Sequence, residues 1–532
     1  MLTASNPILT GFHPDPAVCR VGKDYYLATS TFQWFPGVQL YHSQDLVNWE
    51  ELPSPLSRVS QLDMVGNPNS GGVWGPCLSY SNGKFYLIYT NTKNFHGIFK
   101  DTHNYLVTTD DIYSGEWSEP VYLNSSGFDP SMFHDDDGRK YLLNMRWDPR
   151  MENHPFSGIL MQEYSEKEKK LIGEPKNIFS GTSVGATEAP HLYKKDGYYY
   201  LMVAEGGTMY NHGVLMARSE NLWGPYVPDK TPLLTVRDNP EYPLQRTGHG
   251  SLVDTVNGDW YVAYLCGRPI TEKGRCILGR ETAITQVVWD EDGWLRLKDG
   301  GIAPPLKYSV NLPEQKYEAA PEYEEFSFDV LPPRYKTLRI PFTDEIGSLS
   351  ARDGYLRLYG HEALTSWNKQ ALVARRLQHH KTETTVEMEF APKNFQQTAG
   401  LSVVYDTYNF FYLYMSYEDD ENNVLRIIVR NNLKFYDPLM KGISIGKNTK
   451  VWLRATIVDC QLQFSYSLDN ETYTDIASVL DCSNLSDEAY ADIDHEGHTG
   501  TFLAMACQDQ STGENEKRCY ADFKSIRYRV IE

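Results

Sequence analysis

The sequence is poor in cysteine, in positive charge and in long apolar runs. Only eight of its 532 residues are cysteines, and none form a CxxC pair, which argues against a zinc ribbon or a thioredoxin-like redox site. So few cysteines in so long a chain do not read as a disulfide scaffold either. We therefore expect free thiols in a reducing compartment.

Two further absences concern membranes and export. No run approaches the ~18 consecutive apolar residues that a transmembrane helix needs. Residues 1–16, MLTASNPILTGFHPDP, contain neither the basic nor the apolar segment of a secretory signal peptide. These features predict a cytoplasmic protein without a membrane partner.

Positive charge is scarce, since 50 Lys and Arg stand against 70 Asp and Glu, for a formal net charge of -20. Nucleic-acid binding depends on a basic surface that replaces phosphate counterions, so this balance argues against a nucleic-acid partner. It suits an uncharged substrate such as a sugar, and it equally suits an acidic surface that only confers solubility.

Aromatic residues, in contrast, are abundant and follow a fivefold repeat through the first 300 residues. Each unit contains a short strand rich in Tyr, Leu, Val and Ile that a glycine turn opens. A repeat of roughly sixty residues is typical of a β-propeller with one unit per blade, and it predicts five blades. The strands are GKDYYLATS (22–30), GKFYLIYT (83–90), GRKYLLNM (138–145), GYYYLMVA (197–204) and GDWYVAYL (258–265).

A second recurring piece precedes each aromatic strand by roughly ten residues. Its leading residues are spaced by 59, 55, 59 and 61 positions, so they fall at nearly the same place in five successive blades. The first strand of each blade lines the central channel of a propeller, so these positions converge near the axis. They are Asp15, Trp74, Asp129, Glu188 and His249.

Three converging carboxylates indicate a catalytic site. An Asp-Pro or Glu-Ala-Pro sequence alone is ordinary turn chemistry, but gathering three acids costs repulsion and desolvation that a structural site avoids. Glycoside hydrolysis needs one protonated and one ionised carboxyl, and a third acid can raise the pKa of the protonated one. The spacing leaves the individual roles of the three acids open.

Longer motifs carry a resemblance to a known family. They are GFHPDPAV (11–18), DYYLATSTFQWFPGVQLYHSQDLVNWE (24–50), GNPNSGGVWGP (66–76), GFDPSMFHDDDGRKYL (127–142), TEAPHLYKKDGYYYLM (187–202), AEGGT (204–208), GHGSLV (248–253) and LGRETAI (278–284). With these motifs the chain resembles the β-xylosidases of glycoside hydrolase family 43, in particular the two-domain group with a C-terminal β-sandwich. The resemblance covers essentially the whole chain.

The resemblance implies a role for each acid. Asp15 matches the general base that activates a water molecule, and Glu188 matches the general acid. Asp129 matches the residue that tunes the pKa of the general acid and orients it. The family inverts the anomeric configuration, so the resemblance implies a single displacement by water.

It also implies a set of sugar-binding residues. Arg280 matches an arginine that binds the hydroxyls of the terminal sugar, and His249 matches a histidine on the propeller axis, linked in some relatives to a hydrated calcium ion. Chemistry itself needs no cofactor. The remaining matches are the apolar walls Phe32, Trp74 and Phe128 and the further pocket residue Thr208.

Two departures from the family pattern bear on the site. Relatives often read W-A-P-D-L where this chain has WGPCL (74–78), so an acid is replaced by Cys77. In the segment EGHTGTF (496–502), relatives offer a Phe to the active site, where this chain places Gly497 or His498. The second sugar subsite is therefore expected to be more open or more polar, with a pH-sensitive histidine.

We predict an all-β chain of two domains. The five-bladed propeller spans 1–310, a Pro- and Glu-rich connector spans 311–335, and a jelly-roll, concanavalin-like β-sandwich spans 336–532. Strands are expected at 355–360, 384–390, 409–417, 425–430 and 450–458. By resemblance the sandwich closes the pocket, so that only a chain end enters.

The resulting hypothesis is an inverting exo-1,4-β-xylosidase that acts on xylo-oligosaccharides, with side α-L-arabinofuranosidase activity. One alternative is an enzyme that mainly releases arabinose. Another is a non-catalytic sugar-binding protein, although all three acids and Arg280 are present. A retaining fructosidase fits the motifs poorly. The resemblance also implies a homo-oligomer, either a dimer or a tetramer.

Overall fold

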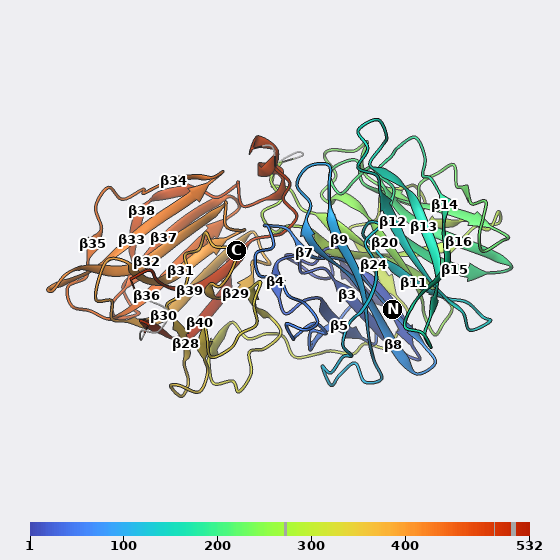
Figure 1. Ribbon diagram of the computed structural model, residues 1–532. Helices are drawn as coiled ribbons and strands as arrows, with labels where there is room; N and C mark the ends of the chain where they lie inside the picture. The colour runs from blue at the N-terminus through green and yellow to red at the C-terminus, as the bar shows by residue number, and fades with distance from the viewer. Residues whose placement is uncertain (271–273, 494, 512–517) are drawn as a thin grey trace.

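The structure is a computed structural model that describes residues 1–532 except 271–273, 494 and 512–517. Two β-domains lie side by side, a propeller and a sandwich (Figure 1). In the described part of the chain, helical structure is confined to the 3-10 helix η1 (Asp487–Ile493), and no helix there is long and apolar enough to cross a membrane. The all-β fold with a five-bladed propeller and a concanavalin-like sandwich is confirmed.

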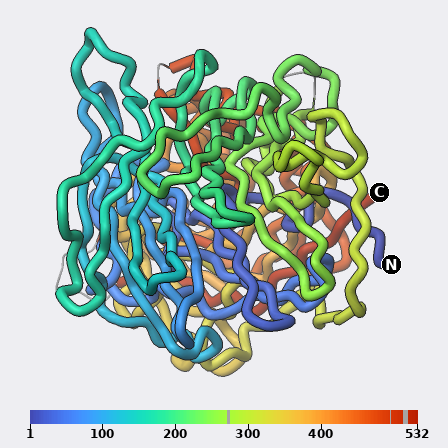
Figure 2. The backbone as a smooth tube through the Cα atoms, turned by 90° about the vertical axis from the view of Figure 1, so that its right-hand side faces the viewer, coloured from blue at the N-terminus to red at the C-terminus, as the bar shows by residue number. Residues whose placement is uncertain are grey.

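Each blade of the propeller is an antiparallel sheet whose strands follow chain order. Neighbouring first strands contact one another around a closed ring, so they line the axis. From the propeller side, Figure 2 shows the chain running from blue through green to yellow-green in front of the orange and red sandwich. The first strands are β2 (Ala17–Val21), β7 (Gly72–Ser81), β11 (Ser131–His134), β15 (Glu188–Lys195) and β20 (Gln245–Asp254).

The aromatic strands of the sequence repeat are the second strands of the blades. They are β3 (Asp24–Thr29), β8 (Lys84–Asn94), β12 (Lys140–Trp147), β16 (Tyr198–Glu205) and β21 (Trp260–Gly267). The outer strands are β5 (Gln39–Ser43), β6 (Glu50–Leu52), β9 (Asp101–Thr109), β10 (Val121–Asn124), β13 (Phe156–Ser165), β14 (Lys170–Phe179), β17 (Gly213–Ser219), β18 (Val227–Pro228), β19 (Leu234–Thr235), β22 (Glu281–Trp289) and β23 (Leu295–Leu297). The second strands are almost wholly buried, because they are packed between neighbouring blades.

The two ends of the propeller are joined by a short antiparallel pair. Strand β1 (Leu2–Ser5) pairs with β24 (Lys307–Val310), which follows the last blade. Beyond β1, the Asn6 side chain donates to the carbonyl of Ile284 at 2.8 Å and accepts from its N–H at 2.9 Å. These contacts hold the first blade against the last one and so fix the segment that leads to Asp15.

A backbone feature recurs once in each blade, just before the first strand or within it. One residue there has a positive φ of 33–57°, and Pro or Gly follows it. These residues are Asp15, Gly75, Asp129, Ala189 and His249. The equivalence expected from the sequence therefore needs a correction, since Trp74 and Glu188 lie one residue before the repeated position.

The second domain is a sandwich of two antiparallel sheets around a large apolar core. The first sheet holds, in order, β27 (Gly347–Ser348), β28 (Leu356–Tyr359), β40 (Tyr520–Val530), β30 (Lys381–Phe390), β36 (Lys450–Val458), β37 (Gln461–Ser467) and β38 (Thr474–Asp481), with β25 (Tyr323–Glu325) beside β40. The second holds β34 (Lys434–Tyr436), β33 (Asn422–Asn431), β32 (Phe410–Asp419), β31 (Gln397–Val404), β39 (Phe502–Asp509), β29 (Ala371–Arg376) and β26 (Tyr335–Leu338), with β35 (Ile443–Ser444) beside β33. Strand β25 belongs to the stretch that was expected to be a connector.

The domains share a sheet edge. Strand β4 (Trp34–Phe35) follows β3 in the first blade, yet it pairs with β26 and extends the second sheet of the sandwich. The Trp34 ring is fully buried and stacks on Phe502 with 3.7 Å between the ring centroids. Because this pairing ties the first blade to the sandwich, it fixes the position of the sandwich over the propeller axis.

Candidate active site

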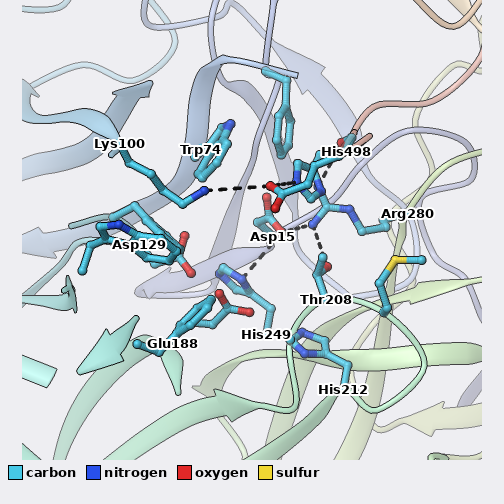
Figure 3. A pocket seen from close by; sticks show the side chains of 17 residues that line it. Asp15, Trp74, Lys100, Asp129, Glu188, Thr208, His212, His249, Arg280 and His498 are labelled. Carbon is cyan, nitrogen blue, oxygen red and sulfur yellow. Dashed lines mark hydrogen bonds and ion pairs between the residues drawn. The ribbon is translucent and has the colours of Figure 1, made fainter. Parts of the chain in front are cut away.

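A cavity of about 270 Å³ opens at the propeller axis beside the sandwich. Figure 3 shows the side chains that line it, with Asp129 and Glu188 on one side, Arg280 and Thr208 on the other and Asp15 between them. All nine residues predicted for the site line this cavity. They are Asp15, Phe32, Trp74, Phe128, Asp129, Glu188, Thr208, His249 and Arg280.

The first strands of the blades position the acids. Asp15 and Asp129 have φ of 57° and 53°, values in the left-handed region that Asp adopts more readily than most residues. Glu188 is the first residue of β15. All three carboxylates are buried, with exposed fractions of 4%, 8% and 8%, and burial of this kind is costly unless the charges are compensated or neutralised.

Asp15 is surrounded by hydrogen-bond donors. Ser30 Oγ donates to its Oδ2 at 2.6 Å, and Arg280 Nη1 donates to its Oδ1 at 3.0 Å. His249 Nδ1 lies 3.6 Å from the same Oδ1. Burial alone would raise the pKa of Asp15, but Arg280, His249 and Ser30 hold it below its ordinary value. Asp15 is therefore ionised at neutral pH.

Glu188 and Asp129 have the opposite behaviour. Burial, followed by repulsion from Asp129 and Asp15, raises the pKa of Glu188 well above its ordinary value. Burial and the charge of Asp15 raise the pKa of Asp129 to about 8. This pair therefore retains a proton at a pH at which Asp15 has lost its own.

Aromatic rings form the apolar side of the cavity. The centroid of Trp74 lies 6.0 Å from that of Phe32 and 5.3 Å from that of Phe128. Trp74 Nε1 donates to the carbonyl of Ser70 at 2.7 Å, which fixes the indole. The Arg280 guanidinium lies over the Phe32 ring at 5.1 Å. Flat apolar walls with few polar groups suit a sugar ring.

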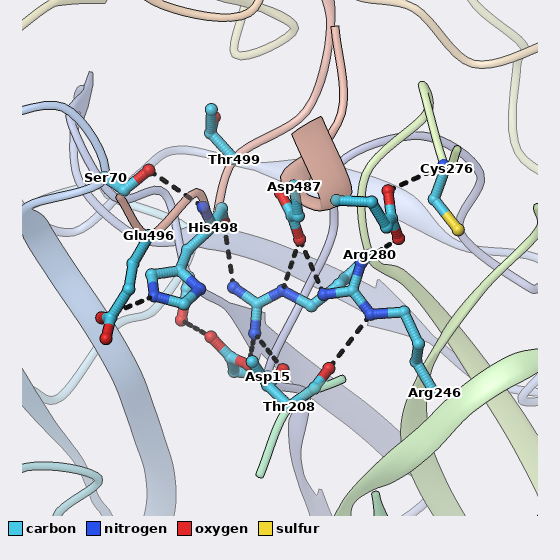
Figure 4. Close-up of polar contacts among 12 residues, drawn as sticks. Asp15, Ser70, Thr208, Arg246, Cys276, Arg280, Asp487, Glu496, His498 and Thr499 are labelled. Atoms are coloured by element: carbon cyan, nitrogen blue, oxygen red, sulfur yellow. Dashed lines mark hydrogen bonds and ion pairs between the residues drawn. The ribbon is translucent and has the colours of Figure 1, made fainter. Parts of the chain in front are cut away.

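The sandwich domain contributes His498 to the lining of the cavity. The sequence had left open whether this residue or Gly497 borders the active site. Its N–H donates to Ser70 Oγ at 2.9 Å, and its carbonyl accepts from Arg280 Nη2, also at 2.9 Å (Figure 4). The His498 ring packs near Phe32 and Trp74, with centroid distances of 6.1 and 5.8 Å. Two propeller residues thus anchor the backbone of the sandwich residue that borders the pocket.

A buried ion network supports Arg280 from behind. Asp487 in η1 pairs with Arg246 at 2.7 Å and lies 3.9 Å from Arg280 Nε. Arg246 Nε also donates to the carbonyl of Thr208 at 3.0 Å, and Thr208 Oγ1 accepts from Arg280 Nη1 at 3.0 Å. The two arginines therefore hold Thr208 between them, and a sandwich carboxylate holds both arginines (Figure 4).

Several lining residues were missed by the sequence analysis. Lys100 donates to the carbonyl of Phe95 at 2.9 Å and lies 3.9 Å from Glu496 of the sandwich. Trp147 ends β12 and Phe156 begins β13, so they flank one loop. This aromatic pair around a hairpin loop was the signal that could have revealed them. The other missed residues are Gly207, Met209, His212 and Glu496.

The surroundings of His249 bear on the hydrated calcium ion that the resemblance implies. In the part of the chain that the structure describes, no group of three or more His, Cys, Asp or Glu side chains is placed to hold an ion. Calcium takes six to eight oxygen ligands, whereas the charged neighbours of His249 are Asp15 and Arg280. Burial also lowers the pKa of His249. We assign no step to a metal.

In the second blade, the motif WGPCL (74–78) brings Gly75 close to Asp129. A Cβ on Gly75 would come within 2.2 Å of Asp129 Oδ1, so only glycine allows this approach with Asp129 as placed. Cys77 is buried with its Sγ 4.0 Å from His191 Nδ1. Among the described residues all eight cysteines are free thiols.

Comparison with known families accounts for both domains. The model of glycosyl hydrolases family 43 matches residues 4–295, and the model of the β-xylosidase C-terminal concanavalin A-like domain matches residues 323–529. The chain belongs to glycosyl hydrolases family 43. The resemblance derived from the sequence motifs is confirmed.

Relatives in this family align along the whole chain. A β-xylosidase of Bacillus subtilis (strain 168) is 49% identical over 99% of both chains, and a xylosidase/arabinosidase 43B of Humicola insolens is 46% identical over 99% of this chain and 98% of its own. The crystal structure of a xylan β-1,4-xylosidase from Bacillus halodurans C-125 superposes with a TM-score of 0.95 at 50% identity, covering 99% of this chain and 100% of that one.

Proposed function

We propose that this family 43 hydrolase is an inverting exo-1,4-β-xylosidase that removes xylose from the non-reducing ends of xylo-oligosaccharides. One observation carries the proposal: in a single cavity the pKa of Asp15 is lowered while the pKa of Glu188 is raised. A pair of carboxyls driven apart in this way provides an acid and a base at the same pH. The xylosidases among the relatives support the choice of sugar.

In the proposed mechanism Asp15 is the general base. It stays ionised because Arg280 and Ser30 donate to its two oxygens. The carboxylate takes a proton from a water molecule, whose oxygen attacks the anomeric carbon from the face opposite the leaving group. One C–O bond forms as the other breaks, so the product sugar has the inverted configuration.

Glu188 is the proposed general acid, and Asp129 its modulator. Glu188 gives its proton to the glycosidic oxygen as the bond to the leaving sugar breaks. Burial raises the pKa of Glu188, and the charge of Asp129 raises it further, so the acid is protonated when the substrate binds. Family 43 hydrolysis needs no cofactor, and here the side chains alone supply both proton transfers.

The walls of the cavity support exo action on a pentose. The volume of about 270 Å³ is smaller than the ~300–1,000 Å³ of sites for drug-sized ligands. Glu496 and His498 of the sandwich border it, so the pocket admits a chain end. Phe32, Trp74 and Phe128 are placed to contact the terminal ring, and Thr208, Arg280 and His249 its hydroxyls.

Side activity on α-L-arabinofuranosides is part of the proposal, because a furanose can present similar hydroxyls to Arg280 and Thr208. The xylosidase/arabinosidase from Humicola insolens supports it. An enzyme that mainly releases arabinose is the second candidate. The ratio of kcat/KM on 4-nitrophenyl β-D-xyloside and 4-nitrophenyl α-L-arabinofuranoside distinguishes the two.

Time-resolved proton NMR of xylotetraose with the purified enzyme tests the main proposal. We expect α-xylose and xylotriose as the first products, before mutarotation. Initial β-xylose would show a retaining enzyme and would overturn the role of Asp15. No cleavage of xylotetraose or of arabinofuranosides would favour a sugar-binding protein.

Three further expectations stay predictions. A homo-oligomer can be tested by analytical ultracentrifugation, and a cytoplasmic location by fractionation of cells. A hydrated calcium ion at His249 can be tested by comparing the activity of chelator-treated enzyme with and without added Ca²⁺.

A further inference from the structure

A second cavity, of about 640 Å³, lies between the propeller and the sandwich and shares no lining residue with the catalytic pocket. Residues 318–321 at its rim are exposed. Its floor is buried and includes His13, from the segment that leads to Asp15, and Arg375 and Arg376, from β29. It therefore joins solvent to a buried surface where the two domains meet.

Three buried N–H donors of residues that line this cavity have no hydrogen-bond partner among the described residues. They are Trp49 Nε1, Arg375 Nε and Arg376 Nη2. The two arginines are more than nine-tenths buried, with exposed fractions of 6% and 4%. A buried donor without an acceptor is costly, and a charged one more so. Three of them around one cavity indicate a site for a ligand rich in acceptors.

The positive charges at this site also lack counterions. Neither Arg375 nor Arg376 has a carboxylate of any described residue within the 4.0 Å of an ion pair. Lys336, which is 1% exposed, donates from Nζ to Ser54 Oγ at 3.1 Å, and burial followed by the charge of Arg376 lowers its pKa well below the ordinary value. The positive charge at the site is therefore that of the two arginines. Buried cations are normally paired, so an anion is the ligand that this arrangement would stabilise.

The cavity has its own carboxylates, but they are not placed to replace that anion. Glu50 Oε1 lies 2.7 Å from His42 Nδ1. Glu318 stands at the exposed rim. Glu51 acts on Lys336 and Arg376 only at longer range. These three acids limit the size of the anion and favour a compact group held directly against the guanidinium groups.

We propose that the cavity between the domains binds a small oxyanion of the phosphate class through Arg375, Arg376 and Trp49. A guanidinium presents its N–H groups in one plane, which matches the oxygens of a phosphate. The Arg375 guanidinium lies over the face of the Tyr528 ring at 4.1 Å, an arrangement that leaves its in-plane N–H groups for a ligand. The indole N–H of Trp49 adds a neutral donor.

The site is linked to the catalytic segment through one hydrogen bond. Arg376 Nε donates to the carbonyl of Phe12 at 2.7 Å, three residues before Asp15. The same arginine belongs to β29 of the sandwich. An anion on its guanidinium would therefore hold a strand of the sandwich and the Asp15 segment of the propeller together, and its main effect is on the stability of the domain interface.

Isothermal titration calorimetry of the full chain with inorganic phosphate, at constant ionic strength set with chloride, tests the proposal. We expect saturable binding of one phosphate per chain, weakened at least tenfold in R375M and in R376M. Arg430→Met is the matched control, because Arg430 also lies over aromatic rings and has an unpartnered Nε, but on β33 outside this cavity. No saturable binding, or equal binding by R375M and the wild type, overturns the proposal.

Two further measurements need no variant. Phosphate that binds only the folded chain raises the Tm by about 1–2 °C at ten times its Kd, with no such rise in chloride of equal ionic strength. Crystals soaked in tungstate should show its anomalous signal beside Arg375 and Arg376, and an occupied site elsewhere with this cavity empty would contradict the proposal. Titration with ribose 5-phosphate distinguishes two sources of the bound phosphate group. Tighter binding than that of inorganic phosphate indicates a sugar phosphate whose ring contacts Trp49, and equal binding indicates the free ion.

Discussion

Arg280 of the propeller donates a hydrogen bond from Nη2 to the backbone carbonyl of His498 of the sandwich at 2.9 Å. Through Nη1 the same guanidinium reaches Asp15 Oδ1 and Thr208 Oγ1, both at 3.0 Å. One side chain therefore orients the proposed base and positions a pocket residue while it contacts the second domain. Removing it would disturb the charge of Asp15 and the closure of the pocket together.

The first prediction concerns this arginine. Arg280→Met should lower kcat/KM on an aryl xyloside on the order of 10²-fold, because the geometry around Asp15 is lost. Arg280 lowers the pKa of Asp15, so that pKa should rise in the variant and the acid limb of the kcat/KM profile should move to higher pH. Arg20→Met, which removes a partly buried ion pair with Asp254 outside the cavity, is the control. An acid limb that stays in place would remove Asp15 from the role of base.

The second prediction concerns the acid pair. In Asp129→Asn the negative charge that raises the pKa of Glu188 is absent. The pKa of Glu188 should fall, so the acid loses its proton at lower pH and the alkaline limb of the profile moves down. Asp136→Asn, whose side chain is 83% exposed, should leave the profile unchanged. The tuning role fails if the alkaline limb of Asp129→Asn matches that of the wild type.

The third prediction separates proton donation from binding. Glu188→Ala should lower kcat on xylobiose by roughly 10²–10⁴-fold, the usual contribution of a general acid. An aryl xyloside with a good leaving group needs little protonation, so its loss should be much smaller. Equal losses on the two substrates, measured in the same buffer, would exclude Glu188 as the acid.

The three acids could be predicted from the sequence because each lies at nearly the same place in a repeated local motif. Asp15, Asp129 and Glu188 lie at the entries to first strands, and the ring of first strands brings those entries together. The register was off by one residue in two blades, because spacing cannot show which residue adopts the left-handed φ. The Asp-Pro, Gly-Pro and Ala-Pro pairs were the signal that would have corrected it.

The domain contacts could not be found in this way. Strand β4 contains only Trp34 and Phe35, too short a segment for any pattern, and its partner β26 lies in the other domain. Lys100 and Glu496 meet at 3.9 Å although they come from different domains. Such contacts depend on how the sandwich sits on the propeller, which local propensity does not encode. The motifs alone therefore predicted the three acids that line the cavity, but not the residues that close it.

The last prediction tests how strongly the two domains depend on the buried network behind the pocket. Asp487 in η1 is fully buried against Arg246, and its Oδ1 accepts from the Tyr405 hydroxyl. Asp487→Ala leaves the Arg246 guanidinium buried with Glu488 as its remaining acidic partner, at 3.1 Å. Breaking a buried pair costs about 3–5 kcal/mol, so the Tm should fall by several degrees, and kcat/KM should fall as Arg280 loses its support.

Asp492→Ala is the matched control in the same helix. Asp492 pairs with Arg275 at 2.9 Å, but its side chain is 55% exposed, and exposed pairs contribute about 0–1 kcal/mol. Differential scanning calorimetry should therefore show a Tm close to that of the wild type for Asp492→Ala and a clear drop for Asp487→Ala. If both variants melt together with the wild type, the network is dispensable for stability, and the support of Arg280 comes from His498 and Thr208 alone.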